Sequence, residues 1–360
     1  MIDLAAFDAL AAGKALGEDC NAQWRVARAP DGNVRAEDFA WIEAPLPIPG
    51  PGEVLLRTLY LGVAPVMRMY MQGTGAAGEQ ALRPGDLIHG RGVAQITKSR
   101  HPDWREGTIV QGQIGWQGWK VSAMTPGERM FRCPNLGLPA MLSCKVLGMT
   151  GLSAHAGLFA CGDPRPGDRM VLSGAAGGVG SIVAQLAANV AGCDVVGVAG
   201  GAAKCAAVRA LGCSAAIDYK SENLPARLAD LRPDGIDLYF DNVGGETLSA
   251  VLDRLAMRAR IVLCGSISEY ARDTPFGLAN YTRLRAKDAS MRGFFVYNHL
   301  DRWDAVIAEL AGHIHDGLLT PVQDVEIGLE RMPYALARLY AGTNVGTQLC
   351  SVRGEPGEWI

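Results

Sequence analysis

The sequence lacks the cysteine pairs on which structural zinc sites depend. Nine cysteines are scattered along its 360 residues, and no two of them form a Cys-x-x-Cys pair. Their odd number and irregular spacing favour free thiols over a disulfide framework, which is typical of a reducing cytoplasm. We therefore expect no bound metal and a cytoplasmic location.

The chain also lacks any concentration of charge of one sign. Its 34 basic and 37 acidic residues give a net charge of −3, and no run of Lys and Arg exceeds two residues. Proteins that bind nucleic acids usually gather positive charge on one face, so we expect no nucleic-acid partner. The first four residues include an aspartate and no basic residue, which argues against a secretory signal.

The sequence also has no segment that is both long and apolar enough to span a membrane, although one stretch meets the length requirement. Residues 170–193 carry no charge over 24 positions, which satisfies the length requirement. This stretch nevertheless holds five glycines and four polar side chains, which makes its transfer into lipid unfavourable. We therefore expect no membrane partner.

Three familiar catalytic signatures are absent too. The sequence contains no Gly-x-Ser-x-Gly elbow, no Tyr-x-x-x-Lys pair and no His-Glu-x-x-His helix. We expect each of the six histidines to be structural or exposed, with His155 the least clear among them. Without a metal, a carbonyl substrate would have to be polarised by hydrogen bonds from a hydroxyl group or a backbone N–H.

What the sequence has in excess is glycine. Glycine accounts for 45 of the 360 residues, well above the usual ~7%. No Gly-X-Y period accompanies it, so a collagen is excluded. We expect these glycines at turns and where the backbone approaches a ligand. The length of the chain suggests about two domains.

The first part of the chain has the sequence pattern of a β-domain. Residues 1–20 are alanine-rich and are predicted to be an extension with a short helix over residues 4–16. Short apolar runs between Gly and Pro then predict strands at 54–60, 93–96 and 108–110. Strands at this spacing favour an antiparallel barrel or sandwich.

From about residue 139 the pattern changes to strands that alternate with helices. The predicted strands are 170–172, 195–199, 216–217, 236–240, 261–264 and 294–297. The predicted helices are 178–190, 202–211 and 303–315. This alternation indicates a parallel sheet with helices on both faces. Because strand-like texture returns after Leu318, we expect an α/β domain at 143–317 inserted into a barrel domain made of 21–142 and 318–360.

The most informative stretch is a glycine-rich turn between a predicted strand and a predicted helix. Gly174, Gly177 and Gly180 follow the strand at 170–172 in the pattern G-x-x-G-x-x-G. Such a turn lets backbone N–H groups and the helix N-terminus meet a pyrophosphate. The following βαβ units supply the required setting, so the sequence predicts dinucleotide binding.

The choice between NAD and NADP is made about 20 residues later, where an acid would hold the ribose 2′-OH. Residues 198–204 contain no carboxylate, and Gly200 stands at the expected place of the acid. Lys204 can neutralise a 2′-phosphate, and Tyr219 lies at the end of the next strand. We therefore predict NADPH/NADP+ as the cofactor.

Several motifs in order carry a resemblance to a known family. They include Gln23-Trp24, Glu43-Ala44-Pro45-Leu46-Pro47, Ser99-Arg100-His101-Pro102, Gly148-Met149-Thr150-Gly151, Asp241-Asn242-Val243-Gly244-Gly245 and Cys264-Gly265-Ser266-Ile267-Ser268. From about residue 21 to 352 the chain resembles the zinc-independent medium-chain dehydrogenase/reductases. Within them it is similar to the branch of prostaglandin reductases, leukotriene dehydrogenases, alkenal double-bond reductases and curcumin reductase.

The resemblance implies an α/β fold in which a GroES-like β-barrel catalytic domain carries an inserted Rossmann domain, a doubly wound parallel sheet. It implies a homodimer that uses NADPH to reduce the C=C bond of an α,β-unsaturated ketone or aldehyde. Hydride would reach the β-carbon, and Tyr270 together with the cofactor ribose would stabilise the enolate. The enone or enal is then the small-molecule partner.

The resemblance also implies a set of site residues. The cofactor would be bound by Met149, Thr150, Gly177, Gly178, Val179, Gly180, Gly200, Lys204, Tyr219, Asn242, Cys264, Gly265, Ser266, Ile267, Phe294, Phe295, Val296 and Asn344. The substrate pocket would include Val66, Arg68 and Tyr281.

The chain departs from the family pattern around the substrate. Ala64 and Val66 stand where an aspartate and a tyrosine are common, and Thr347 replaces a usual lysine. Two alternatives therefore remain, a quinone oxidoreductase on the same fold and an NADPH-binding protein that has lost turnover.

Overall fold

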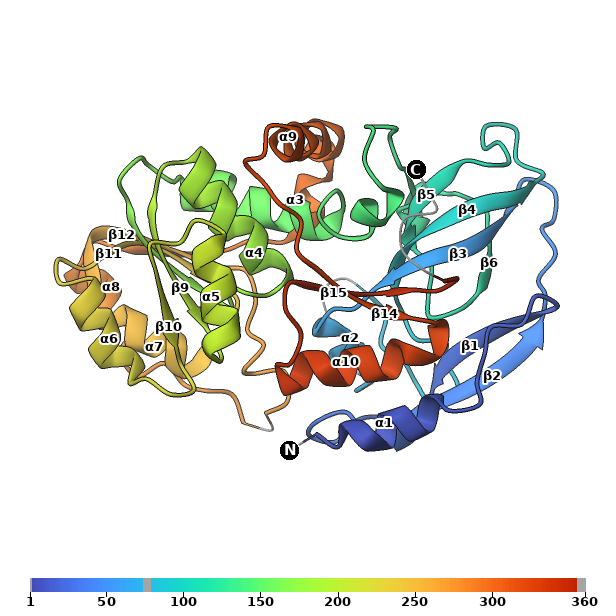
Figure 1. Cartoon of the computed structure of the whole chain (residues 1–360), viewed down its shortest axis with the longest axis horizontal. Coiled ribbons are helices and arrows are strands. Elements are labelled where there is room, and N and C mark those ends of the chain that lie inside the picture. The colour runs from blue at the N-terminus through green and yellow to red at the C-terminus, as the bar shows by residue number, and fades with distance from the viewer. Residues whose placement is uncertain (1, 74–78, 273, 355–360) are drawn as a thin grey trace. The chain divides into compact units, whose positions relative to one another are not determined.

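The computed structural model describes residues 2–73, 79–272 and 274–354 of the chain, which divide into two compact units (Figure 1). The first unit comprises the described residues of 1–148, 323–344 and 348–360, and the second comprises 149–322 and 345–347. The chain leaves the first unit after residue 148, returns at residue 323 and enters the second unit again for residues 345–347, so most of the second unit is an insertion in the sequence of the first.

The first unit is built on antiparallel strands (Figure 1). Its main sheet has the order β14-β15-β3-β4-β5-β7, with β6 paired to β3. The bounds are β3 Val54–Gly62, β4 Arg91–Ser99, β5 Ile109–Gln113, β6 Trp119–Ser122, β7 Phe131–Arg132, β14 Gln323–Ile327 and β15 Thr347–Ser351. A separate pair joins β1 (Cys20–Val26) to β2 (Phe39–Pro45). This is the GroES-like barrel that the sequence predicts.

Aromatic side chains fill the core of this unit and fix its N-terminal helix. Trp24, Phe39 and Trp116 are buried, and the rings of Phe39 and Trp116 stack with centroids 5.9 Å apart. Helix α1 (Leu4–Ala11) buries Phe7 against Phe39, and Asp8 on it forms an ion pair of 2.6 Å with Arg331. The helix is shorter than the expected 4–16 and packs as part of the barrel core.

The C-terminal helix of the first unit was not predicted. Helix α10 (Met332–Ala341) lies where the sequence analysis expects only strand-like texture. Its signals were nevertheless present, because Pro333 stands in the first turn and Gly342 ends the helix in the left-handed conformation. The remaining short elements here are α2 (Val66–Tyr70) and the 3-10 turns 36–38, 126–128, 140–144 and 329–331.

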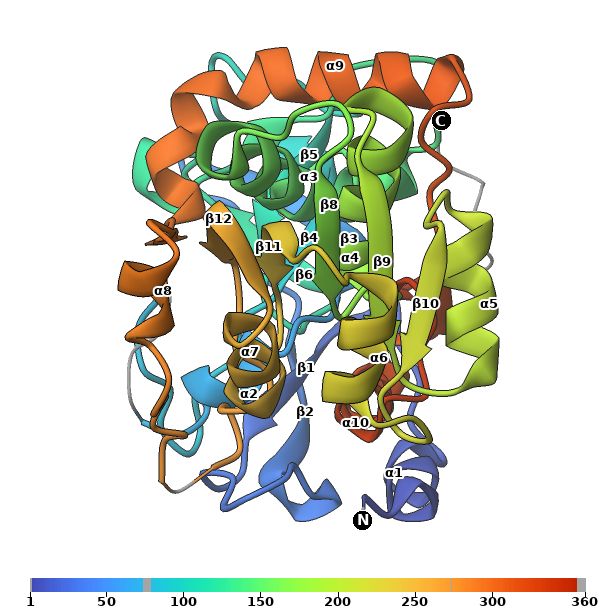
Figure 2. The ribbon, with the colours of Figure 1, turned by 90° about the vertical axis from the view of Figure 1, so that its left-hand side faces the viewer.

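The second unit contains a parallel six-stranded sheet, shown in Figure 2 with β12, β11, β8, β9 and β10 side by side. The full order is β10-β9-β8-β11-β12-β13. The bounds are β8 Arg169–Ser173, β9 Asp194–Ala199, β10 Ala215–Asp218, β11 Ile236–Asp241, β12 Leu255–Leu263 and β13 Ser290–Gly293. The chain reverses its direction across the sheet between β8 and β11, which is where doubly wound sheets bind ligands.

Helices cover both faces of this sheet. Val196 and Val198 of β9 belong to a buried cluster with Leu228 and Leu248 of two helices, whereas Gly197 between them faces Val208 of another helix. The helices are α3 Met149–His155, α4 Gly178–Gln185, α5 Ala202–Ala210, α6 Leu224–Leu231, α7 Gly245–Leu252, α8 Arg283–Ala286 and α9 Trp303–His315. Alternation along β9 therefore confirms the doubly wound Rossmann arrangement.

Two π-helical segments, 156–162 and 186–190, continue α3 and α4. The predicted strand at 294–297 is wrong. Strand β13 lies four residues earlier, and residues 296–302 form a 3-10 turn. The reason is that the partner strand β12 ends at Leu263, which pairs with Gly293 and leaves the aromatic run no ladder to join.

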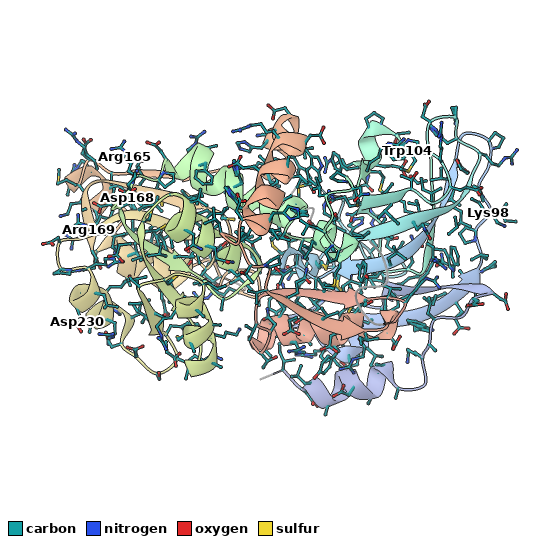
Figure 3. All side chains as sticks on the ribbon, turned by 45° about the horizontal axis from the view of Figure 1, so that its top comes forward. Lys98, Trp104, Arg165, Asp168, Arg169 and Asp230 are labelled. Atoms are coloured by element: carbon teal, nitrogen blue, oxygen red, sulfur yellow. The ribbon has the colours of Figure 1, made fainter. Side chains whose placement is uncertain are left out.

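Ion pairs concentrate at the amino ends of the strands. Figure 3 shows Arg165, Asp168 and Arg169 together at the start of β8. The carboxylate of Asp168 lies 2.5 Å from Arg260, and Arg169 donates to Asp237 at 2.7 Å. These charged groups thus lie at the amino edge of the sheet. The glycine turn that follows β8 lies at the opposite, carboxyl edge. No helix in the described part of the chain is long and apolar enough to cross a membrane.

Candidate functional site

The glycine turn that follows β8 has a backbone that only glycine permits at two positions. Gly174 has a φ of +59°, and its carbonyl oxygen accepts the Gly177 N–H at 2.9 Å. A Cβ placed on Gly180 would overlap that same carbonyl oxygen. Helix α4 can therefore start close against the turn only because Gly180 has no side chain.

The start of α4 presents backbone donors. Gly177 is its N-cap residue, and no side chain among the described residues caps the first turn. The first N–H groups of a helix have no partner within the helix and carry the positive end of its dipole. The cradle that Cβ atoms would fill and the eight-residue helix behind it fit the pyrophosphate of a dinucleotide.

A second segment of the chain lies beside the turn. The Gly346 N–H donates to the Ala176 oxygen at 2.7 Å, and Gly346 forms a parallel bridge with Gly177. A Cβ on Gly178 would lie 3.3 Å from Thr347 Oγ1 and 3.7 Å from the methyl group of Thr150. The predicted residue Thr150 thus reaches the turn, together with Gly346 and Thr347, which were not among the predicted site residues. The Asn-Val-Gly motif at 344–346 was the available signal.

The next strand ends beside two further predicted residues. Gly200 follows β9, and a Cβ on it would lie 2.9 Å from the ring of Tyr219 and 3.0 Å from Lys220. Glycine at this position therefore lets the half-exposed Tyr219 ring lie over the backbone. Lys204 stands in the first turn of α5, partly buried. Gly200 and Tyr219 thus lie together beyond the carboxyl ends of β9 and β10, where the sequence analysis expects the adenosine end.

A carboxylate that local sequence reasoning missed reaches the same place. Asp218 at the end of β10 accepts the Gly201 N–H at 2.7 Å, the Lys220 N–H at 3.0 Å and the Ser221 hydroxyl at 2.8 Å. The Gly201 N–H is the largest cause that lowers the pKa of Asp218 below its usual value. The Asp218 carboxylate thus binds donors of its own loop and of the turn before α5, and these three hydrogen bonds stabilise its negative charge.

The carboxyl ends of β8 and β11 are tied by a buried network. Asp241, which is fully buried, accepts hydrogen bonds from Ser173 Oγ at 2.8 Å and from the Tyr239 hydroxyl at 2.7 Å. The predicted residue Asn242 follows it and donates from its amide to the Ser173 carbonyl oxygen at 2.8 Å. This network holds Asn242 next to Gly174, whose Cβ would lie 3.3 Å from it.

The loop after β12 contains the predicted nicotinamide strip. The N–H groups of Cys264 and Gly265 donate to the backbone carbonyl oxygen of Asp241 at 2.9 and 3.1 Å. Burial raises the pKa of the Cys264 thiol to about 12, so the thiol is neutral. The hydroxyl of Tyr270 accepts the Ser266 N–H at 3.4 Å. The predicted catalytic tyrosine thus lies over the predicted strip, with Ile267 accepting the Tyr270 N–H.

An open hollow of about 590 Å³ follows β13 in the second unit. Its lining residues are Arg292, Gly293, Phe294, Phe295, Asn298 and His299. The predicted residues Phe294 and Phe295 therefore line a depression, and Val296 begins the 3-10 turn behind it. Tyr281, which was predicted for the substrate pocket, is exposed before α8.

The other predicted residues belong to different places. Val66 is the first residue of α2 in the first unit, and Asn344 is buried at the end of the segment 323–344. The side chain of Arg68, predicted for the substrate pocket, is only 1% exposed, and its Nε donates to the Gly32 oxygen at 2.6 Å. Met149 begins α3.

His155, whose role was the least clear from the sequence, lies in a packed and hydrogen-bonded environment. His155 is buried, packs on Phe159 and shares a hydrogen bond of 3.1 Å with Glu309. Desolvation is the main cause that lowers the pKa of His155. Within residues 2–73, 79–272 and 274–354, no group of three or more His, Cys, Asp or Glu side chains could hold a metal ion.

Two family models match the chain. Residues 22–130 match the N-terminal domain of oxidoreductase, and residues 178–312 match the zinc-binding dehydrogenase family. The first region covers β2 to β6 of the barrel unit, and the second covers β9 to β13 of the Rossmann sheet.

Known proteins match over most of the length. The NADP(+)-dependent 2-alkenal reductase of Nicotiana tabacum is 35% identical over 85% of this chain and 89% of its own. The NADPH-dependent curcumin reductase of Escherichia coli is 34% identical over 93% of this chain and 98% of its own. The crystal structure of CurA from Vibrio vulnificus in complex with NADPH superposes with a TM-score of 0.86 and 31% identity, over 93% of this chain and 100% of that one.

Proposed function

Since the chain belongs to the zinc-independent medium-chain dehydrogenase/reductases, in the branch of alkenal, curcumin and prostaglandin reductases, we propose that it reduces the C=C bond of an α,β-unsaturated ketone or aldehyde with NADPH. The observation that carries the proposal is the glycine turn after β8. Its backbone leaves the space that a pyrophosphate needs, in a chain whose relatives are named for this chemistry.

The cofactor would be held along the carboxyl edge of the Rossmann sheet. Gly177 to Gly180 would bind the pyrophosphate, and Lys204 with Tyr219 would bind the 2′-phosphate end. Asn242, the strip 264–267 and the segment 294–296 would flank the ribose and the ring at the other end. When bound, a reduced nicotinamide supplies the hydride for the β-carbon of the substrate.

The Asp218 carboxylate is compatible with a 2′-phosphate because it is already engaged. Its two oxygens accept from Gly201, Lys220 and Ser221, so the nearby backbone partly compensates its charge. Lys204 and Lys220 add positive charge near the same turn. The local balance favours NADPH over NADH.

Tyr270 is proposed to stabilise the oxygen of the substrate. Negative charge moves to the carbonyl oxygen as the β-carbon is reduced, and a hydroxyl that donates to this oxygen lowers the energy of the enolate. A phenol can accept one hydrogen bond, as Tyr270 does from Ser266, and donate another. Protonation of the α-carbon then completes the reduction.

We extend the proposal to the assembly and the domains. The enzyme is a homodimer of the cytoplasm, by analogy with its family. The barrel domain is 21–142 and 318–360 and includes Val66, which we assign to the substrate pocket; the inserted domain is 143–317. Size-exclusion chromatography coupled to light scattering tests the dimer directly.

The test of the activity is an NADPH-oxidation assay over alkenals, alkenones and a benzoquinone, with product identification. We expect the saturated ketone or aldehyde as the product, with NADPH strongly preferred to NADH. Turnover of the quinone alone would instead show a quinone oxidoreductase. Quenching of tryptophan fluorescence by NADPH without oxidation by any of these acceptors would show a binding protein.

A further inference from the structure

A lysine is buried in the barrel unit at a position that the proposed mechanism does not use. Lys145 follows the 3-10 turn 140–144 and is 8% exposed. Its Nζ donates to the Val63 carbonyl oxygen at 2.7 Å. A lysine is almost never buried without a specific partner, so this contact needs a reason.

The barrel provides room for this side chain. A Cβ on Gly62 would overlap Cε of Lys145 and lie 3.0 Å from Nζ. The stem of the lysine therefore lies directly across Gly62, the last residue of β3. Any other residue at this position would displace the amine from the Val63 oxygen.

A second side chain holds the same short segment. The Tyr340 hydroxyl, on α10, donates to the Pro65 oxygen at 2.7 Å. The Val63 N–H donates to the Gln348 oxygen at 3.0 Å. Residues 63–65 are thus fixed at both ends, and Pro65 is the N-cap residue of α2. The next residue, Val66, is the proposed wall of the substrate pocket.

We propose that Lys145 is a positioning residue for the substrate pocket, which together with Tyr340 fixes residues 63–65 and so sets the affinity for the enone. This inference rests on the proposed function in assigning Val66 to the pocket. Lys145 need not touch the substrate, because it acts through the carbonyl oxygen that it holds.

The proton on Lys145 is lost within an accessible pH range. Burial lowers the pKa of Lys145 to about 8. In the part of the chain that the structure describes, the ionisable group that acts on Lys145 is the neighbouring Cys144 thiol. Burial raises the pKa of that thiol to about 12, so the thiol does not titrate between pH 6.5 and 9.5. An ammonium donates a stronger hydrogen bond than an amine. The segment should therefore be held more firmly below pH 8 than above it.

The decisive measurement is the pH dependence of KM and kcat for an enone. For the wild type we expect KM to rise ~5- to 10-fold between pH 7 and pH 9, as one charge-assisted hydrogen bond is weakened. In Lys145→Met we expect a high KM that no longer changes with pH, while kcat and KM for NADPH stay within about twofold of the wild type.

Two further variants separate this role from general damage. Lys98→Met removes an exposed lysine of β4 and should behave as the wild type (Figure 3). Tyr340→Phe should raise KM and keep the pH step, because Lys145 is intact. A pH step that survives in Lys145→Met, or an equal loss of kcat and kcat/KM, overturns the proposal.

Hydrogen–deuterium exchange decides the inference even if no enone is reduced. The Met67 and Arg68 amides, which donate to the Ala64 and Pro65 oxygens, report on the segment. We expect faster exchange there in Lys145→Met than in Lys98→Met at pH 7, with the difference disappearing at pH 9. Equal exchange at pH 7 contradicts the positioning role, whereas absent turnover with this exchange pattern contradicts only the proposed function.

Discussion

The carboxylate of Asp218 accepts the N–H of Gly201 at 2.7 Å, which joins the end of β10 to the turn that begins α5. The two residues are 17 positions apart, and Gly201 has a φ of +96°. The loop that should meet the 2′-phosphate is therefore shaped by an acid from the neighbouring strand, whose carboxylate holds the backbone of that loop.

Replacing Asp218 with Asn should lower stability in a pH-dependent way. The pKa of Asp218 is lowered, so its stabilising contribution is present above the unfolded value near 3.8 and is lost as pH falls through the folded value. At pH 7 we expect Asp218→Asn to melt about 1–3 °C below the wild type. The difference should shrink as the pH falls below 3.8. Asp230→Asn, at an exposed position of α6, is the control in the same thermal scans.

Lys204 should decide between the two cofactors. We expect Lys204→Ala to raise KM for NADPH ~10-fold, the loss of one charged hydrogen bond to a phosphate, and to leave KM for NADH unchanged. Initial rates with each cofactor at saturating enone give the comparison, with Lys98→Ala as the matched control. An equal change for NADPH and NADH would place Lys204 outside the phosphate site.

Two Gly→Ala substitutions should have opposite effects. The methyl group of Gly180→Ala would overlap the Gly174 oxygen, so we expect loss of NADPH binding and a lower melting temperature. Gly312 lies inside α9 with no atom within 4 Å of its Cβ position. Gly312→Ala should therefore stabilise the protein by ~0.5–1 kcal/mol through helix propensity. Binding by fluorescence and unfolding in urea measure both, and a stable, NADPH-binding Gly180→Ala would refute the close-approach argument.

Tyr270→Phe should reduce the chemical step more than binding. Loss of one hydrogen-bond donor to a developing oxyanion typically costs ~10²–10³ in kcat. KM for NADPH should change little, because the loop backbone at 264–267 remains. Single-turnover rates of NADPH oxidation test this. Parent-like rates on every enone would remove Tyr270 from the catalytic role.

The buried amine of Lys145 should cost stability at neutral pH. Because its pKa is lowered from 10.5 to about 8, the wild type carries the cost of a buried ammonium below pH 8 and gains stability as pH rises to 10.5. Lys145→Met should therefore unfold at a higher urea concentration than the wild type at pH 6.5. We expect its free energy of unfolding to be higher by on the order of 1–3 kcal/mol, after the lost hydrogen bond is counted. The advantage should shrink towards pH 10.5. A difference that is constant with pH would contradict the lowered pKa.

The features that were predicted correctly are those that short sequence windows determine. The strand–glycine–helix order around Gly174 and the periodicity of residues 303–315 each specify one local structure, and both agree with the fold. The helix at 332–341 also had local signals, in Pro333 and Gly342, which the surrounding strand-like texture obscured.

The features that were missed depend on distant partners. No window around Gly200 contains Asp218, and only strand pairing brings β10 beside β9. The motif around Arg68 likewise does not show that its Nε donates to the Gly32 oxygen, 36 positions away. The strand at 294–297 failed for the same reason, because the end of β12 decides where β13 can pair.

The pairing of β15 with β3 has a consequence for how the chain is made. Leu349 pairs with Gly62 and Ser351 with Tyr60, so the barrel sheet joins residues almost 300 positions apart. During synthesis, residues 149–322 of the inserted unit emerge while the barrel still lacks its closing strand and the inserted unit still lacks residues 345–347. Because chains of this size fold by units in the order of synthesis, most of the Rossmann unit can fold first. The half-finished barrel must keep an open sheet edge protected until the ribosome has released residue 351.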